Sequence, residues 1–165
     1  MTESPIQALD PLAIIRVLND HGVRYVVIGG IAAGVQGAMW ATTDLDIAYA
    51  RDRDDHQRLA AALATLEAAP VELPPDVRVA LDARSLAMGS TWTLMTRFGR
   101  LDLLAEPAGI SYASLASSAR TIRGEQTYQV ASVDDLITMK RAAGRAKDLG
   151  HLELLEATRD ELSKG

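Results

Sequence analysis

The segment from residue 24 to residue 49 constrains the fold more than any other, because it predicts two strands joined by a glycine turn and a short helix. Arg24 to Gly29 (RYVVIG) is short, β-branched and ends in glycine, which is typical of a buried strand. The small, alanine-rich residues 30–37 follow directly and predict a helix. Residues 43–49 (TDLDIAY) alternate apolar and acidic side chains, which predicts a strand with one apolar and one acidic face.

The remaining segments predict further helices and strands on both sides of this unit. Periodicity and turn residues predict helices over 11–19, 53–67, 110–116, 132–143 and 147–162, and strands over 77–81, 91–98, 100–104 and on either side of Gly124-Glu125. The order predicts an α/β (α+β) fold, with a small mixed sheet flanked by helices and further helices at the C-terminal end. Because no linker interrupts the chain, we expect one domain over residues 1–165, with its core at about 24–130 and its C-terminal helices at about 132–162.

The composition excludes several classes of protein. The chain has no cysteine, and its histidines at positions 21, 56 and 151 lack the spacing of a zinc site. The start is polar and acidic, and no apolar run reaches the roughly 20 residues of a membrane span, so we expect a cytoplasmic protein with no membrane partner. The net charge of -5 argues against a long, nonspecific nucleic-acid footprint. Residues 120–147 nevertheless hold six bases and three acids, which leaves room for one RNA end inserted locally.

The acidic face of the second predicted strand is the sharpest chemical signal. Asp44 and Asp46 point to the same side, with Cα atoms about 6.5–7 Å apart. Both carboxylates can therefore meet one hard cation such as Mg²⁺, which binds together with substrate phosphates. A solvated strand face is the alternative, because the pattern is short and common. The preceding Gly29-Gly30 turn favours the metal, since a helix that begins at glycines offers its amides to phosphate.

Two further groups of residues are candidates for the same chemistry. Asp102 is a single carboxylate in an apolar strand, where it either caps the turn after Gly99-Arg100 or completes a three-carboxylate site for two metals. Near the C-terminal end, Lys140, Arg145 and Asp148 form an ion-pair latch between two helices or bind the phosphates of a nucleotide. His151 lies one helical turn from Asp148 and is within reach of a hydrogen bond to it.

Three segments in this order resemble the nucleotidyltransferase-fold superfamily, and in particular small bacterial nucleotidyltransferase-like proteins that include the AbiEii-type toxins. They are IGGIAAGVQGAMWATTDLDI (28–47), TRFGRLDLL (96–104) and ASVDDLITMKRAAGRAKDLGHLELL (131–155). The first is similar to the entry motif of that fold, and the second to its third-carboxylate strand. The last is similar to the C-terminal signature K-x(4)-R-x-K-D. The resemblance covers nearly the whole chain.

The resemblance implies transfer of a nucleoside monophosphate from an NTP such as ATP to an acceptor, with Mg²⁺ required and pyrophosphate released. It implies a tRNA or a protein as acceptor and, in the toxin branch, a cognate antitoxin as partner. Carried over by position, the implied catalytic and metal-binding residues are Asp44, Asp46 and Asp102, with Asp102 ligating a second metal or activating the acceptor hydroxyl. The implied nucleotide-binding residues are Gly29, Gly30, Thr42, Lys140, Arg145 and Asp148.

Trp40 is the point at which the chain departs from this pattern. Many relatives carry an arginine three residues after the glycine at position 37, with a threonine two places later, which Thr42 matches. Trp40 either stacks on a base or fills the core, and Arg51 and Arg53 are the nearest candidates to supply the missing charge. The substitution favours a second hypothesis, a non-catalytic binding or regulatory module with this fold. A third is an antibiotic nucleotidyltransferase, which the acidic composition suits because such drugs are cationic.

Overall fold

The protein is described by a computed structural model that covers residues 8–165. Fifteen elements follow one another along these residues: α1 (Pro11–Asp20), β1 (Tyr25–Ile28), α2 (Gly29–Gln36), β2 (Asp44–Tyr49), α3 (Arg53–Thr65), β3 (Ala69–Pro70), α4 (Ala83–Met88), β4 (Thr91–Thr96), β5 (Gly99–Leu104), the 3₁₀ helix η1 (Pro107–Gly109), α5 (Tyr112–Ser118), β6 (Arg120–Ile122), β7 (Tyr128–Val130), α6 (Val133–Ala143) and α7 (Asp148–Ser163). The predicted order of helices and strands is confirmed except within residues 69–90 and at η1, which was not predicted.

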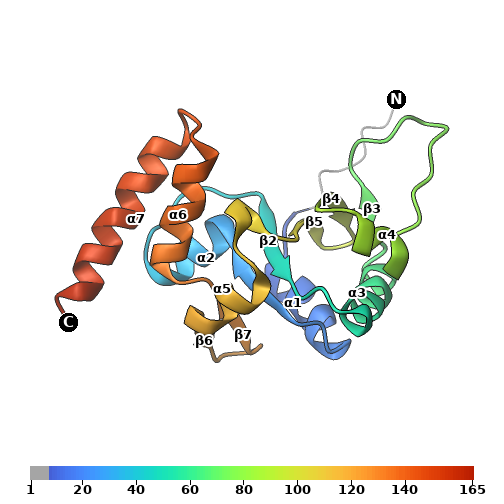
Figure 1. The fold of residues 1–165 in the computed structure, drawn as a ribbon, viewed down its shortest axis with the longest axis horizontal. Helices are drawn as coiled ribbons and strands as arrows, with labels where there is room; N and C mark the ends of the chain where they lie inside the picture. Colours follow the sequence, from blue (N-terminus) through green and yellow to red (C-terminus); the bar gives the residue numbers. More distant parts are fainter. Residues whose placement is uncertain (1–7) are drawn as a thin grey trace.

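A mixed seven-stranded sheet forms the centre of the molecule, in the order β3-β4-β5-β2-β1-β7-β6 (Figure 1). β2 runs parallel to β5 and β1 parallel to β7, and the other neighbours are antiparallel. The strands predicted at 91–98 and 100–104 form the hairpin β4–β5, and those on either side of Gly124-Glu125 form the hairpin β6–β7. Helices lie around this sheet, and α6 and α7 form a hairpin that stands at one end of the molecule (Figure 1).

The two faces of β2 and β5 differ as their alternation predicts. Leu45, Ile47, Leu101 and Leu103 are fully buried and belong to the same hydrophobic cluster as the apolar residues of α1 and α3. Between them, Asp44, Asp46 and Asp102 are only partly buried and form the acidic face, whereas Ala48 on the same face of β2 is buried. Because burying an aliphatic side chain contributes about 1.5–3 kcal/mol, the apolar face holds these strands in place and fixes which side the carboxylates occupy.

Capping residues lie at the start of α1 and at both ends of α6. The carboxylate of Asp10 accepts a hydrogen bond from the amide of Ala13 at the start of α1. The hydroxyl of Ser132 accepts one from the amide of Asp135 at the start of α6, and Gly144 ends α6 with a φ of +61°. These caps fix the ends of α6, on which part of the candidate site depends.

The expected strand at residues 77–81 is wrong, because these residues form no strand. Ala69–Pro70 pairs with Met95 and Leu94 at the edge of β4 instead, and the 77–81 segment pairs with no strand. The structure also contains a helix, α4, that was not expected from this proline-rich stretch. The carboxylate of Asp82 caps it by accepting a hydrogen bond from the amide of Ser85.

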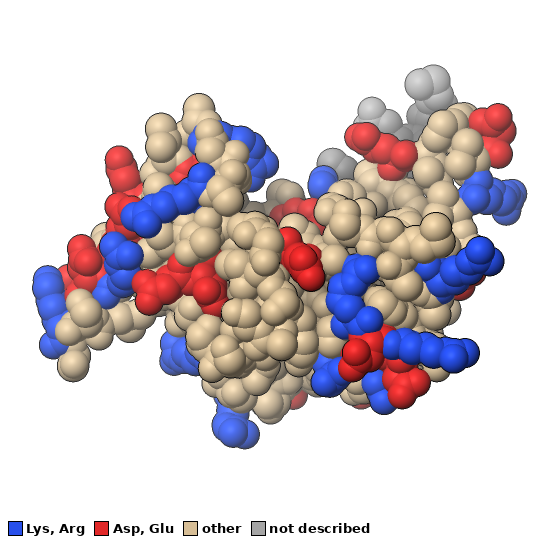
Figure 2. Space-filling model, viewed as in Figure 1, with Lys and Arg blue, Asp and Glu red and all other residues tan. Residues whose placement is uncertain are grey.

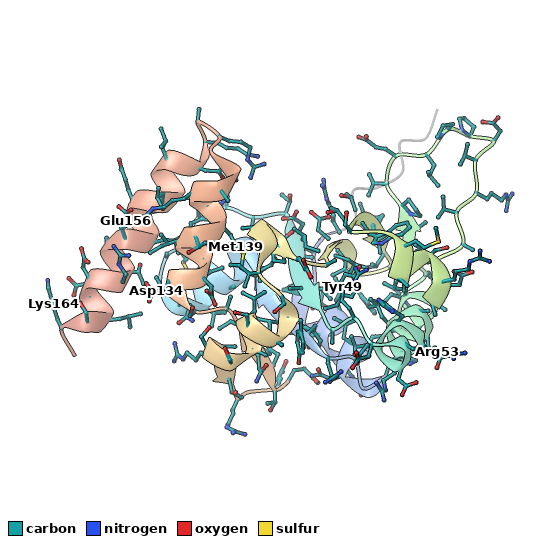
Figure 3. The ribbon with its side chains drawn as sticks, viewed as in Figure 1. Tyr49, Arg53, Asp134, Met139, Glu156 and Lys164 are labelled. Carbon is teal, nitrogen blue, oxygen red and sulfur yellow. The ribbon has the colours of Figure 1, made fainter. Side chains whose placement is uncertain are left out.

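The α6–α7 hairpin packs its apolar side chains inward. Leu136, Ile137 and Leu155 are buried, and Figure 3 shows Met139 on α6, Glu156 on the outer helix, α7, and Lys164 directly after the end of α7. Among residues 8–165, no helix has the length and apolar character needed to cross a lipid bilayer.

Candidate active site

Asp44, Asp46 and Asp102 come together because β2 and β5 are parallel and in register. Asp46 is the Cα partner of Asp102, and Asp44 is the partner of Arg100. Register partners point to the same face, so the three carboxylates share one side of the sheet. One oxygen of each lies within 4.8 Å of the others. The third-carboxylate alternative for Asp102 is therefore the one the structure supports.

Burial and neighbouring carboxylates raise the pKa of two members of the triad, by which we mean Asp44, Asp46 and Asp102. The pKa of Asp46 rises from 3.8 to about 8, mainly because burial disfavours its charged form and also because the other two carboxylates are close. Burial likewise raises the pKa of Asp102, with a further contribution from Asp44. Arg100 opposes both shifts. Burial and the neighbouring carboxylates therefore outweigh the effect of Arg100 on both pKa values.

The glycine turn between β1 and α2 lies directly against the triad. Gly29 follows Ile28, the register partner of Asp46, and has a φ of +70° that favours glycine. A Cβ atom at position 29 would collide with the carboxylate of Asp46. No side chain caps the start of α2, so its first amide groups are free to meet an anion. The turn therefore brings an anion-binding helix end beside the acidic cluster.

A second group of charges, Lys140, Arg145 and Asp148, connects the two C-terminal helices. The Asp148 carboxylate is 3% exposed and accepts hydrogen bonds from Lys140 Nζ at 2.9 Å and Arg145 Nε at 2.7 Å. Although burial alone would raise it, these two cations hold the pKa of Asp148 well below its usual range. The ion-pair latch, one of the two alternatives for these residues, is thus present, and it fixes the direction of both basic side chains.

Both groups open onto one cleft of about 760 Å³ between the sheet and the hairpin. Eight of the nine residues implied by the family resemblance line it: Gly29, Gly30, Thr42, Asp44, Asp46, Asp102, Lys140 and Arg145. The ninth, Asp148, is not part of the lining and supports the two cations. The Thr42 hydroxyl donates to Asp44 Oδ1 at 3.2 Å and so also orients a member of the triad. Figure 2 shows Lys and Arg side chains at the tip of the hairpin, where the connection contains Arg145 and Lys147.

Trp40 contributes to the wall of this cleft rather than to the interior of the core. It is half-buried and stacks on His151, with ring centres 4.1 Å apart and planes at 7°. Lys140 Nζ lies 5.1 Å from the centre of the Trp40 ring and 3.2 Å from His151 Nδ1. His151 is 4.0 Å from Asp148, so its hydrogen-bond partner is Lys140 and not the expected carboxylate.

Arg100 is a residue of the site that the sequence reasoning did not single out. Its Nε lies 3.3 Å from Asp102 and 3.9 Å from Asp44. The signal was available, because residues two apart on a strand share a face. Arg51 instead donates to the carbonyl oxygens of Ala87 and Gly89, and Figure 3 places Arg53 on α3, far from the hairpin. Neither lines the cleft, so neither supplies the charge that is absent at Trp40.

The triad suits a magnesium ion by the chemistry of its donors. Three carboxylates with converging oxygens offer the hard ligands that Mg²⁺ prefers. A dication bound there would neutralise the charge that these carboxylates carry when they are ionised. The absent Cβ of Gly29 also leaves the Asp46 carboxylate uncrowded.

Comparison with known proteins identifies the fold. No protein-family model and no curated protein sequence matches the chain. Solved structures do match. A Thermotoga maritima protein, TM1012, described as a nucleotidyltransferase, is 16% identical, with a TM-score of 0.50 over 93% of this chain and 91% of its own. A solution structure of the antibiotic-resistance factor ANT(2'')-Ia is 13% identical, with a TM-score of 0.57 over 90% of this chain and 80% of its own.

A second structure of ANT(2'')-Ia, in complex with adenylyl-2''-tobramycin, is 12% identical, with a TM-score of 0.57 over 92% of this chain and 93% of its own. The chain has a nucleotidyltransferase-type fold. The fold expected from the three sequence segments is thereby confirmed. At this level of identity the similarity concerns the fold alone, so the toxin branch stays a prediction.

Proposed function

We propose that the protein is a Mg²⁺-dependent nucleotidyltransferase that moves a nucleoside monophosphate from an NTP to a hydroxyl acceptor and releases pyrophosphate. The observation that carries the proposal is the convergence of three carboxylates beside an uncapped helix N-terminus, within one cleft that also exposes Lys140 and Arg145. Negative groups for a cation and positive groups for phosphates are both required to bind a metal–triphosphate complex.

The triad would hold Mg²⁺ through Asp44, Asp46 and Asp102. Bound there, Mg²⁺ would supply charge stabilisation for the phosphate groups during an in-line displacement. Thr42 keeps Asp44 oriented through its hydroxyl, and Gly29 keeps space beside Asp46. These neighbours matter because carboxylates that are already oriented for the cation lose less conformational freedom when it binds.

We infer from the order of the strands that the two substrates would occupy different sides of the triad. Gly29 and Gly30 adjoin β1, whereas Asp102 lies on β5, two strands away. The triphosphate would therefore lie toward the glycine turn, with Lys140 and Arg145 contacting its outer phosphates. The acceptor would approach from the side of β5. Its oxygen attacks the α-phosphorus, the bond to pyrophosphate breaks, and the hydroxyl proton passes to a carboxylate such as Asp102.

The acceptor is the finer part of the proposal. A tRNA or a protein follows from the resemblance to the toxin branch, in which a cognate antitoxin would be the partner. ANT(2'')-Ia is solved with an adenylylated tobramycin, so an aminoglycoside is the third acceptor class to include. Non-catalytic nucleotide binding is a second function, and it is favoured by Trp40, because many members of the family that the chain resembles carry an arginine at this position.

The test is incubation with α-labelled NTPs, Mg²⁺ and a panel of acceptors consisting of total tRNA, cellular protein and tobramycin. We expect label transfer and pyrophosphate release by the wild type and loss of both in Asp44→Ala. Binding of NTP without transfer to any acceptor would support the non-catalytic module. Absence of transfer, together with equal NTP and metal binding by wild type and Asp44→Ala, would exclude the proposal.

A further inference from the structure

Arg100 lies beside the triad because of its position on β5. It stands two residues before Asp102 on β5, and its Cα is the register partner of Asp44 on β2. Side chains at these positions share one face of the sheet, so strand alternation and register bring the guanidinium to the same side as the carboxylates. The position is set by register and does not depend on a loop conformation.

The contacts of Arg100 match this position. Among the ion pairs formed within residues 8–165, only those of Arg100 reach the triad, at 3.3 Å from Asp102 and 3.9 Å from Asp44. Both contacts use Nε. No residue in the described part of the chain accepts a hydrogen bond from its two terminal amino groups. Arg100 is thus attached to the triad by one nitrogen, which is a contact that can be exchanged.

Arg100 also has space to move. Its side chain is 42% exposed and lines the main cleft on one side. On the other side it lines a separate depression of about 340 Å³ over β3 and β4, together with Glu72 and Thr93. A rotation of the side chain would carry the guanidinium from the triad into this open region without disturbing the buried face of β5.

We propose that Arg100 is a built-in counter-ion, which neutralises Asp44 and Asp102 while no divalent cation is bound and gives way when one binds. Three carboxylates within 4.8 Å repel one another, and a cation between them keeps the arrangement assembled. A dication needs the same oxygens, so it competes with the guanidinium for them. Arg100 is therefore a positioning residue of the metal site. This inference rests on the proposed function only in taking the triad to be a divalent-metal site.

Direct titration with Mn²⁺ tests the competition in the metal-free protein. We expect Arg100→Gln to bind Mn²⁺ about tenfold more tightly than the wild type, because the positive charge that opposes the incoming ion has gone. Arg100→Lys keeps a charge at this position and is expected to bind within about twofold of the wild type. Arg97→Gln is the matched control. Arg97 is an exposed arginine in the turn between β4 and β5, and its guanidinium lies over the ring of Phe98. Because it forms no ion pair with the triad, its loss should leave Mn²⁺ binding unchanged.

Thermal unfolding separates a counter-ion from a merely structural side chain. In EDTA, Arg100→Gln is expected to melt several degrees below the wild type, and saturating Mn²⁺ should remove that difference, since the ion replaces the lost charge. If the variant does not fold without metal, refolding in Mn²⁺ should recover it. Equal or weaker Mn²⁺ binding by Arg100→Gln, or a stability loss that Mn²⁺ does not repair, would overturn the proposal.

The readouts keep this inference apart from the proposed function. Mn²⁺ binding and melting are measured without nucleotide or acceptor. A protein that shows the expected exchange but transfers no nucleotide would refute the proposed function and leave Arg100 as the counter-ion of a metal site. A wild type and an Arg100→Gln variant that both fail to bind Mn²⁺ would refute the counter-ion proposal itself.

Discussion

Asp46 and Asp102 are register partners on two parallel strands, although two helices and two strands separate them along the chain. Their pairing turns an acidic strand face into a three-carboxylate cluster. It also contributes to the raised pKa of Asp46, of which burial is the main cause and the neighbouring Asp44 and Asp102 are further causes. The following predictions test the parts of this arrangement separately.

Asp46 should make the metal-free protein less stable as the pH rises. Its pKa is 3.8 ordinarily and about 8 in the fold, so the folded state keeps a proton that the unfolded state loses. The stabilising contribution is complete below the unfolded pKa and disappears as the pH rises through about 8. Melting curves in EDTA between pH 5 and pH 9 should therefore fall more steeply for the wild type than for Asp46→Asn.

Millimolar Mg²⁺ at pH 9 supplies the control for this experiment. The ion should raise the melting temperature of the wild type, because it neutralises the ionised triad, and should raise that of Asp46→Asn much less. Parallel pH dependence of the two proteins in EDTA would show that the Asp46 carboxyl is not buried among like charges.

Asp148 should stabilise the hairpin through its two cations. Asp148→Asn leaves Lys140 and Arg145 without their charged partner. We expect a loss of about 2 kcal/mol in the free energy of unfolding, below the cost for a fully buried pair because Arg145 is 57% exposed. The lowered pKa of Asp148 means that its contribution is present above the unfolded pKa and is lost as the pH falls through the folded one. The difference between variant and wild type should therefore shrink in strong acid.

Glu156 provides the matched control for Asp148. It accepts a hydrogen bond from Arg141 at 2.9 Å on the same hairpin, but this pair is solvent-exposed, with the Arg141 side chain 57% and the Glu156 side chain 36% exposed. Glu156→Gln should cost no more than about 0.5 kcal/mol in chemical denaturation. A similar loss in the free energy of unfolding for both variants would mean that Asp148 stabilises the hairpin no more than an exposed ion pair does.

Gly29→Ala should damage the site more than the fold. Alanine at a φ of +70° costs about 1–2 kcal/mol, and its Cβ would displace the Asp46 carboxylate. We expect loss of divalent-metal binding, measured by Mn²⁺ titration, in a protein that still folds. Gly124→Ala is the control, since a Cβ there meets no atom within 4 Å. Metal binding by Gly29→Ala at the wild-type level would contradict the role given to this turn.

Trp40 should contribute to the affinity for NTP. Trp40→Ala removes a wall of the cleft and the ring against which Lys140 and His151 rest, so we expect NTP affinity to fall roughly three- to tenfold. Trp40→Phe should retain most of the affinity. The only other tryptophan, Trp92, does not line the cleft, and Trp92→Phe should leave NTP affinity unchanged in calorimetry. Full affinity in Trp40→Ala would place the nucleotide away from this wall.

Local patterns in the sequence were sufficient for most of the fold. The acidic face of β2 follows from strict alternation, and the hairpin of α6 and α7 follows from apolar spacing together with Ser132 and Gly144. Such features depend on residues close in the chain. The segment at 77–81 shows the limit, since whether it becomes a strand depends on the edge of β4, which Ala69–Pro70 already pairs.

Contacts between distant residues were beyond that reasoning. Nothing near Trp40 indicates that it stacks on His151 of α7, because that contact depends on how the hairpin packs against the sheet. Arg100 was overlooked for a different reason. Its place beside Asp102 is visible from strand alternation, but its contact with Asp44 requires the register of β2 and β5.

The most direct test of the account is the anomalous diffraction of Mn²⁺ in crystals grown with a non-hydrolysable NTP. The account predicts a manganese peak bounded by the carboxylates of Asp44, Asp46 and Asp102, with the triphosphate extending toward Gly29 and Lys140. A nucleotide bound elsewhere, or a cleft that holds the nucleotide with no manganese at the three carboxylates, would contradict it.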